Sequence, residues 1–257
     1  WNDLDLDKVY SKLDRNYSSL GEASLYSMLR NPLNDEKKLN KRREEIEYFK
    51  ENEEVRFKIM WIFFELGRDK KNSLLDMINE KLIESNKFKY YFYTITGKIL
   101  PLILILTAIF VSVSAMLGLM AVTFVNIYIN SKERDRIKAN GLMYLRRVMK
   151  ASKQIVKIND KNLESFNIKI RENLKDLKSI DRNTIMISFI NMWGGVFEFI
   201  SVLFLLEETA YYKIADSIEK NKDSILSLYK TLGEMEAIIS IGSYEEEKKD
   251  KITRPKF

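Results

Sequence analysis

The chain lacks two residue types on which much protein chemistry depends. Its 257 residues include no cysteine and no histidine. Their absence excludes disulfides, zinc sites built from Cys or His, nucleophilic cysteine and histidine acid–base catalysis. Proline and glycine are also scarce, with three and nine residues. A β-rich fold needs more turn residues than this, whereas long helices tolerate the composition well, so we predict an all-α protein.

Recognisable catalytic motifs are missing as well. Neither G-x-x-x-x-G-K-[ST] nor G-x-G-x-x-G occurs, so the two common phosphate-binding loops are excluded. Two carboxylate pairs, Glu207-Glu208 and Glu234/Glu236, have no histidine or metal-ligand companion, and we expect them to be surface charges of helices. We therefore predict no catalytic, cofactor-binding or metal-binding residue in this chain, which is not expected to be an enzyme by itself.

One long stretch lacks charge altogether. No charged side chain lies between Lys98 and Lys132, a run of 33 residues. About 20 apolar residues suffice to cross a bilayer, and a soluble core helix seldom stays apolar all round for so long. As a single helix the run would be about 50 Å long, so it forms either one tilted span or two helices in a hairpin. A turn would fall among the small residues Ser112, Ser114 and Gly118.

The charges on either side of this run favour the hairpin. Residues 132–182 carry fifteen Lys or Arg against seven Asp or Glu, and the preceding flank is basic too. Because Lys and Arg near a span stay in the cytoplasm, both flanks belong on the same side. A single span that returns through residues 184–206 would instead export the most basic segment. We predict a hairpin at about 99–130, a cell-membrane location with the core facing the cytoplasm, and a buried or interfacial helix at 184–206. That helix is interrupted by polar or small residues: Asn191, Gly194, Gly195 and Glu198.

Local signals predict the other helices. Ser19 and Glu22 form a capping-box pattern, and Asn31-Pro32 ends the helix that follows. Asn34 or Asp35 can cap the next helix, and a third runs from about 53 to 66 and ends at Gly67. Later helices are expected at 132–159, 161–181, 207–220 and 223–240.

The helix at 132–157 is basic. Five of its cations could contact phosphates of DNA or of anionic lipid: Arg146, Arg147, Lys150, Lys153 and Lys157. Next to a membrane segment, anionic lipid is the favoured partner, and non-specific DNA is the alternative.

The two ends of the chain resemble the helical core, or lever, domain of the MutS family. The N-terminal resemblance consists of a small-residue turn with Gly21, a Leu-rich helix, a break containing Pro32 and Asp35, and a helix with Arg42. Near the other end, the acidic signature of the returning core helix matches Glu234, Glu236, Ala237 and Ser240. The final Arg254-Pro255 is similar to the segment that precedes the family's ATPase domain. Together these matches cover roughly residues 1–66 and 205–257.

The sequence also departs from mismatch repair proteins. The core motif begins almost at residue 1, and an apolar run stands where the lever helices would lead to a DNA clamp. The chain therefore looks like membrane-associated MutS-related proteins, in which a transmembrane hairpin interrupts the helical core. Because it begins with Trp1, we expect it to be a piece of a longer protein. The resemblance implies a homodimer and a following domain of the same protein that binds ATP and Mg²⁺.

These observations predict five segments. They are a first part of the core at 1–96, the hairpin at 97–131, basic and interfacial helices at 132–206, returning core helices at 207–244 and a linker at 245–257. Two apolar faces should pack together in the core: Leu29, Leu33, Leu39 and Ile46 against Leu228, Leu232 and Ile239. The leading hypothesis is a non-catalytic lever and membrane anchor of a MutS-related ATPase. The alternatives are a DNA-binding clamp module and a purely structural membrane protein.

Overall fold

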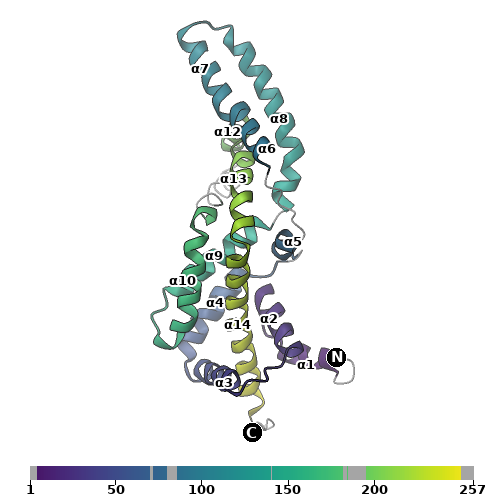
Figure 1. Ribbon diagram of the computed structural model, residues 1–257, viewed down its shortest axis with the longest axis vertical. Helices are drawn as coiled ribbons and strands as arrows, with labels where there is room; N and C mark the ends of the chain where they lie inside the picture. Colours follow the sequence, from purple (N-terminus) through teal and green to yellow (C-terminus); the bar gives the residue numbers. More distant parts are fainter. Residues whose placement is uncertain are drawn as a thin grey trace. The chain divides into compact units, whose positions relative to one another are not determined.

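The computed structural model in Figure 1 describes residues 5–69, 72–79, 86–139, 141–181, 184 and 195–249. These residues form helices and contain no strand, which confirms the all-α prediction. The described residues fall into two compact units. Unit 1 comprises those of 1–70, 147–175 and 223–257, and unit 2 comprises those of 71–146 and 176–222.

Unit 1 is built from both ends of the chain and part of its middle. Its N-terminal helices are α1 (Leu6–Leu13), α2 (Ser19–Arg30), α3 (Glu36–Glu51) and α4 (Glu53–Leu66). Later residues add most of α9 (Leu142–Val156), η3 (Lys161–Leu163), most of α10 (Glu164–Asp176) and nearly all of α14 (Lys222–Glu247). Fully buried apolar side chains from these helices make its core, among them Leu20, Leu25, Phe49, Phe63, Leu232 and Met235.

Helices α2 and α3, from the first segment of the chain, contact α14 from its last segment within unit 1, and the sequence predicted contact between these two segments. Leu20 of α2 lies so close to α14 that a Cβ on Gly233 would overlap its carbonyl oxygen. Gly242 faces α3 less tightly, because a Cβ there would lie 3.5 Å from the Ile46 side chain, an ordinary contact distance. Ile46, Leu228, Leu232 and Ile239 are buried, whereas Leu29, Leu33 and Leu39 are only half-buried. The contact therefore uses the first turn of α2 rather than its last.

Unit 2 contains the apolar run. Its helices are α5 (Ser73–Asn79), α6 (Lys87–Thr94), the π-helical stretch η2 (Ile95–Ile99), α7 (Leu100–Phe110), α8 (Ala115–Ala139), α12 (Val196–Phe204) and α13 (Leu206–Lys220). Helices α7 and α8 lie side by side and run in opposite directions (Figure 1). A helical hairpin therefore forms, with its turn at 111–114.

A π-helical stretch leads into this hairpin. Pro101 has no N–H to donate in the first turn of α7, and the helix widens immediately before it. At Gly97 the backbone comes close to the junction of α12 and α13, because a Cβ there would lie 2.6 Å from the Phe204 carbonyl oxygen. Leu205, with φ of 46°, makes the sharp turn at that junction. This contact packs the hairpin's first arm on α12.

The helix boundaries agree with most sequence signals. Helix α2 ends before Asn31-Pro32, Asp35 caps α3 through the N–H groups of Lys37 and Lys38, and α4 spans 53–66. The N-cap of α2, however, is Ser18 and not Ser19. Its Oγ accepts from the Gly21 N–H at 3.3 Å, while the Ser19 Oγ accepts from the Asp69 N–H at 2.9 Å.

Three other predictions need adjustment. Gly118 lies inside α8 against Leu104 rather than in the turn of the hairpin. Of the predicted helix 184–206, the described part is α12 at Val196–Phe204, and Asn191 and Gly194 lie outside the described residues. Helix α14 continues to Glu247, so the segment predicted as a linker from 245 begins as helix. Arg254 and Pro255 lie outside the described residues.

Candidate membrane-contacting hairpin

The hairpin presents apolar side chains that the other described residues of unit 2 leave exposed. Helix α7 leaves five large apolar side chains about half exposed or more, and the first half of α8 leaves another five. They are Leu102, Ile103, Leu106, Ile109 and Phe110 on α7, and Met116, Leu117, Met120, Phe124 and Val125 on α8. An exposed apolar surface of this extent marks a site of contact with protein or membrane.

A continuous helix from Lys87 to Phe110 includes the first arm. Among the described residues, it alone is long and apolar enough to cross a membrane, with 24 residues. Core helices of soluble proteins pass the same test of length and composition, but their side chains are mostly buried. Here only 17% of the apolar window is buried, which is the opposite of a core helix. The second arm has a shorter apolar part, because charged residues begin at Lys132 within α8.

A polar cluster joins the base of the hairpin to the neighbouring helices of unit 2. The buried carboxylate of Glu133 on α8 accepts from the Lys89 Nζ at 2.8 Å and from the hydroxyls of Tyr93 at 2.9 Å and Tyr212 at 2.8 Å. Burial by itself would raise the pKa of Glu133, but the hydrogen bonds from Lys89, Tyr212 and Tyr93 outweigh it and hold the pKa below its ordinary value. Glu133 is therefore a charged tie between α6, α8 and α13.

A second group of polar contacts involves residues of α8 that lie nearer the tip of the hairpin than Glu133. Asn126 donates to the carbonyl oxygens of Thr96 at 3.1 Å and Leu203 at 2.7 Å, and Asn130 donates to Glu208 at 2.7 Å. Glu208 is fully buried, and this burial raises its pKa to about 7 despite the Asn130 hydrogen bond. Its Oε2 has no hydrogen-bond partner among the described residues. A proton on Glu208 therefore removes a costly buried charge.

The sequence did not lead us to these base residues. Glu207 and Glu208 were expected to be surface charges, but both are buried, as is Glu236, and Glu234 alone of the four is exposed. The expectation failed because the residues that follow Glu208 are mostly small, aromatic or apolar. Most of them are buried, and the start of α13 with Glu207 and Glu208 is buried together with them. The i, i+4 spacing of Asn126 and Asn130 on an otherwise apolar helix was an available signal, since polar residues there need partners.

The predicted phosphate-contacting cations lie on α9 and just after it. Lys150 and Lys153 are exposed on one side of the helix, and Lys157 is exposed immediately beyond its end. Arg146 is half-buried, and the Arg147 guanidinium donates to the Leu66 carbonyl oxygen at 3.1 Å. The structure therefore aligns three of the five cations, while Arg147 also braces the end of α4.

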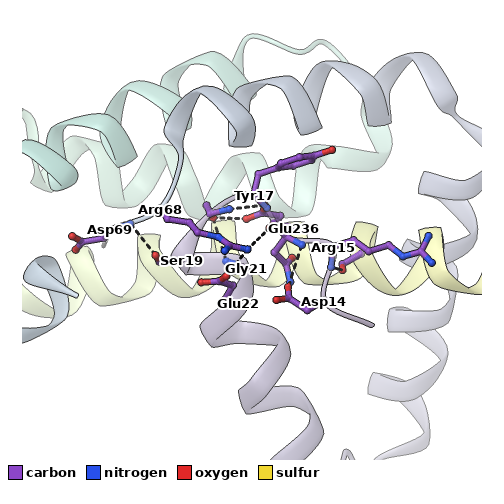
Figure 2. A network of polar contacts seen from close by, with 12 residues as sticks. Asp14, Arg15, Tyr17, Ser19, Gly21, Glu22, Arg68, Asp69 and Glu236 are labelled. Atoms are coloured by element: carbon purple, nitrogen blue, oxygen red, sulfur yellow. Dashed lines mark hydrogen bonds and ion pairs between the residues drawn. The ribbon is translucent and has the colours of Figure 1, made fainter. Parts of the chain in front are cut away.

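Of the family-motif residues, Gly21 lies beside Glu236 of α14, within the network of polar contacts that Figure 2 shows. The Glu236 carboxylate accepts from the backbone N–H of Tyr17 at 2.6 Å and of Ser18 at 3.1 Å, and it also bonds the Ser18 hydroxyl. The carboxylate thus lies at the N-terminus of α2, where the helix dipole favours negative charge. Burial nevertheless dominates and raises the pKa of Glu236 to about 7, against the opposing hydrogen bonds.

Other contacts in unit 1 support this junction. Arg15 lies beside the C-terminal part of α14, where its backbone N–H donates to the Ser240 Oγ at 2.8 Å. Arg68 forms an ion pair with Glu22 at 2.7 Å (Figure 2). Of the remaining motif residues, Gly21 is buried beside Glu236, Pro32 is exposed after α2, and Arg42 is half-buried on α3. Gly21 has a structural role, because a Cβ there would overlap the Glu236 carboxylate, and Pro32 follows the end of α2.

The structure therefore defines an all-helical protein with an exposed apolar hairpin. Polar contacts join the base of this hairpin to the neighbouring helices of unit 2. Within its described residues no group of three or more acidic side chains gathers that could hold a metal ion. The chain matches no known family model, no curated protein and no solved structure. The likeness to the MutS family rests on the sequence motifs alone.

Proposed function

We propose that this chain anchors a helical body at a membrane through the α7–α8 hairpin, with both ends of the hairpin on the cytoplasmic side. One observation carries the proposal: two contacting helices hold no charge from residue 99 to 131 and leave most of their large apolar side chains exposed. Moving one such Leu or Phe from water into lipid gains about 1.5–3 kcal/mol. Ten of them would supply more than enough free energy for stable attachment.

Flotation with liposomes tests the anchor. The double variant Leu106→Glu/Leu117→Glu places carboxylates on the two arms at side chains that are 52% and 72% exposed, so folding should be unaffected. Because a carboxylate in hydrocarbon is costly, we expect the floating fraction to fall by about tenfold or more. The matched control is Ile168→Glu, which charges a 48% exposed apolar side chain on α10 of unit 1 and should float like the wild type. Flotation of the double variant at the wild-type level would refute the proposal.

The motif resemblance supports a more specific role. We propose that unit 1 is the helical core of a MutS-related ATPase, and that this non-catalytic chain transmits ATP-driven motion of a further domain to the membrane or to a partner. Contacts in unit 1 between the two motif-bearing ends, such as Glu236 with Ser18, are consistent with such a core. ATP and Mg²⁺ would bind in that further domain, and the assembly would be a homodimer.

Reading the gene beyond the codon for Phe257 tests this role directly. A downstream G-x-x-x-x-G-K-[ST] motif is expected, and the full product should hydrolyse ATP. A reading frame that ends without a nucleotide-binding motif would leave a purely structural membrane protein and would overturn the ATPase assignment.

A second candidate function is supported by the exposed lysines on α9 and immediately after it. Lys150, Lys153 and Lys157 could follow a phosphate backbone, as in a DNA-binding clamp of the MutS type. Binding of this kind weakens steeply with salt, by about one unit of log–log slope for each phosphate contacted. The triple change of these lysines to glutamine should then abolish DNA binding at low salt. No DNA binding by the wild type at low salt would dismiss this function and leave anionic lipid as the partner of these lysines.

A further inference from the structure

The tip of the hairpin has an unusual composition for a turn. Its most exposed side chains are apolar: Phe110 and Val111 are 79% exposed, and Val113 is 72% exposed. The remaining residues of the turn, Ser112 and Ser114, are small and uncharged. A turn that emerges into water on the far side of a membrane is normally made of polar or charged residues, and nothing here would hold this turn in water.

Three of the four backbone N–H groups of the turn donate to acceptors within the hairpin. The N–H groups of Val111 and Ser112 both donate to the Thr107 carbonyl oxygen at 2.9 Å, and the Ser114 N–H donates to the Ser112 Oγ at 3.3 Å. The first three N–H groups of α8 donate to the carbonyl oxygens of residues 112, 113 and 114. The two serine hydroxyls bond each other at 2.8 Å. Internal pairing of this kind is what a backbone needs in hydrocarbon, where water cannot replace a missing partner.

The arms are too short to carry the tip across a bilayer. Lys98 is the charged residue nearest the tip on the first arm, twelve residues before Phe110, which is about 18 Å of helix. On the second arm, Lys132 lies 17 residues after Ala115, or about 26 Å. The hydrocarbon core is about 30 Å thick. Full crossing by the helix Lys87–Phe110 would leave Lys98 near its midpoint, with an ammonium group in the middle of the membrane.

We infer that the hairpin enters a single leaflet and stops there, with residues 111–114 among the acyl chains near the bilayer midplane. This inference rests on the proposed function and deepens it, because it names the acyl chains of the cytoplasmic leaflet as the partner of the tip. Helix α7, with 11 residues and a length of about 16 Å, matches the depth of one leaflet. Lys98 then lies at the level of the lipid head groups.

Aromatic side chains mark the same boundary. Tyr128 on α8 is 59% exposed, and the Lys132 ammonium lies over its ring at 4.6 Å from the centroid. On α6, Phe88, Tyr91 and Phe92 are exposed and precede Lys98 in the same continuous helix, on the side away from the tip. Exposed aromatic rings beside lysines are typical of the interface between hydrocarbon and water.

Single cysteines test the depth, since the full chain has none of its own. Val113→Cys reports on the tip, and Ser165→Cys, exposed on α10, is the control for the cytoplasmic side. The protein is reconstituted into vesicles of phosphatidylcholine and phosphatidylglycerol. A membrane-impermeant maleimide is then supplied either outside or trapped in the lumen. We expect Cys labelling at 113 to be about tenfold slower than at 165 from outside and to be negligible from the lumen, because hydrocarbon excludes the reagent.

Fluorescence quenching gives the depth itself. A fluorophore attached at position 113 should be quenched more strongly by spin labels near the end of the acyl chains than by labels near the head group. Labelling at 113 from the lumen, or stronger quenching by shallow labels, would overturn the single-leaflet arrangement. Protection of position 113 in detergent-free protein without lipid would also overturn it, because a second copy would then cover the tip. Failure of the protein to float with vesicles is a separate outcome, which would refute the membrane anchor itself.

Discussion

Replacing Glu236 by glutamine is expected to remove a large part of the pH dependence of unfolding. Folding raises the pKa of this carboxyl from its ordinary value of 4.5 to about 7, because it is only 3% exposed. The folded state therefore binds more protons than the unfolded state between these two values. The contribution of Glu236 to the free energy of unfolding is therefore largest below pH 4.5 and is lost as the pH rises through 7.

The size of the effect follows from the shift. Each pKa unit corresponds to about 1.4 kcal/mol, and the range from pH 5 to pH 8 includes most of the shift, so Glu236 should contribute on the order of 2 kcal/mol of lost stability. Glutamine mimics the protonated acid. Its carbonyl oxygen can accept from the Tyr17 and Ser18 N–H groups, and its amide can donate to the Ser18 Oγ, whose hydroxyl donates to the carboxylate in the wild type.

Urea unfolding followed by circular dichroism at pH 5 and pH 8 measures this difference, with hydrogen exchange of α2 as the local readout. The control is Glu234→Gln, an exposed carboxylate two residues away on the same helix. We expect the control to retain the wild-type pH dependence and Glu236→Gln to lose about 2 kcal/mol of it. Burial shifts the pKa of Glu208 in the same direction, so Glu208 should contribute to the pH dependence that remains. An unchanged pH dependence in Glu236→Gln would refute the reasoning.

Three further substitutions test the packing and the ties between helices. Gly233→Ala places a methyl group against the Leu20 carbonyl oxygen and should destabilise the protein by about 1–3 kcal/mol in urea unfolding, so an unchanged midpoint would contradict the close contact. Lys89→Met leaves the Glu133 carboxylate without its cation and should lower the melting temperature in detergent by an amount that Glu133→Gln in the same chain partly restores; additive losses would argue against the pair. Asp35→Ala removes the cap of α3 and should cost about 1 kcal/mol, whereas Asp35→Asn should be nearly neutral.

Much of the secondary structure was determined by the sequence alone, because its signals are local. The N-cap at Asp35, the stop at Asn31-Pro32 and the end of α4 at Gly67 each depend on a few neighbouring residues. The uncharged run likewise predicted a helical hairpin, since 33 residues without charge and with few turn residues have few other arrangements. The MutS resemblance remains an expectation from motifs.

The tertiary structure decided which polar residues are buried. The sequence could not distinguish Glu236 from Glu234, two residues apart on α14, because their exposure depends on where α2 packs. The sequence also could not predict the hydrogen bonds between Glu133 and Tyr212 or between Asn130 and Glu208, because the partners lie far apart in the chain. The inference of a single-leaflet depth also depended on the position where α7 ends, on the hydrogen bonds of the turn and on the distance of Lys98 from the tip. Helix boundaries depend on residues that are neighbours in the chain. The burial and hydrogen bonding of polar side chains depend on residues that are neighbours only in space.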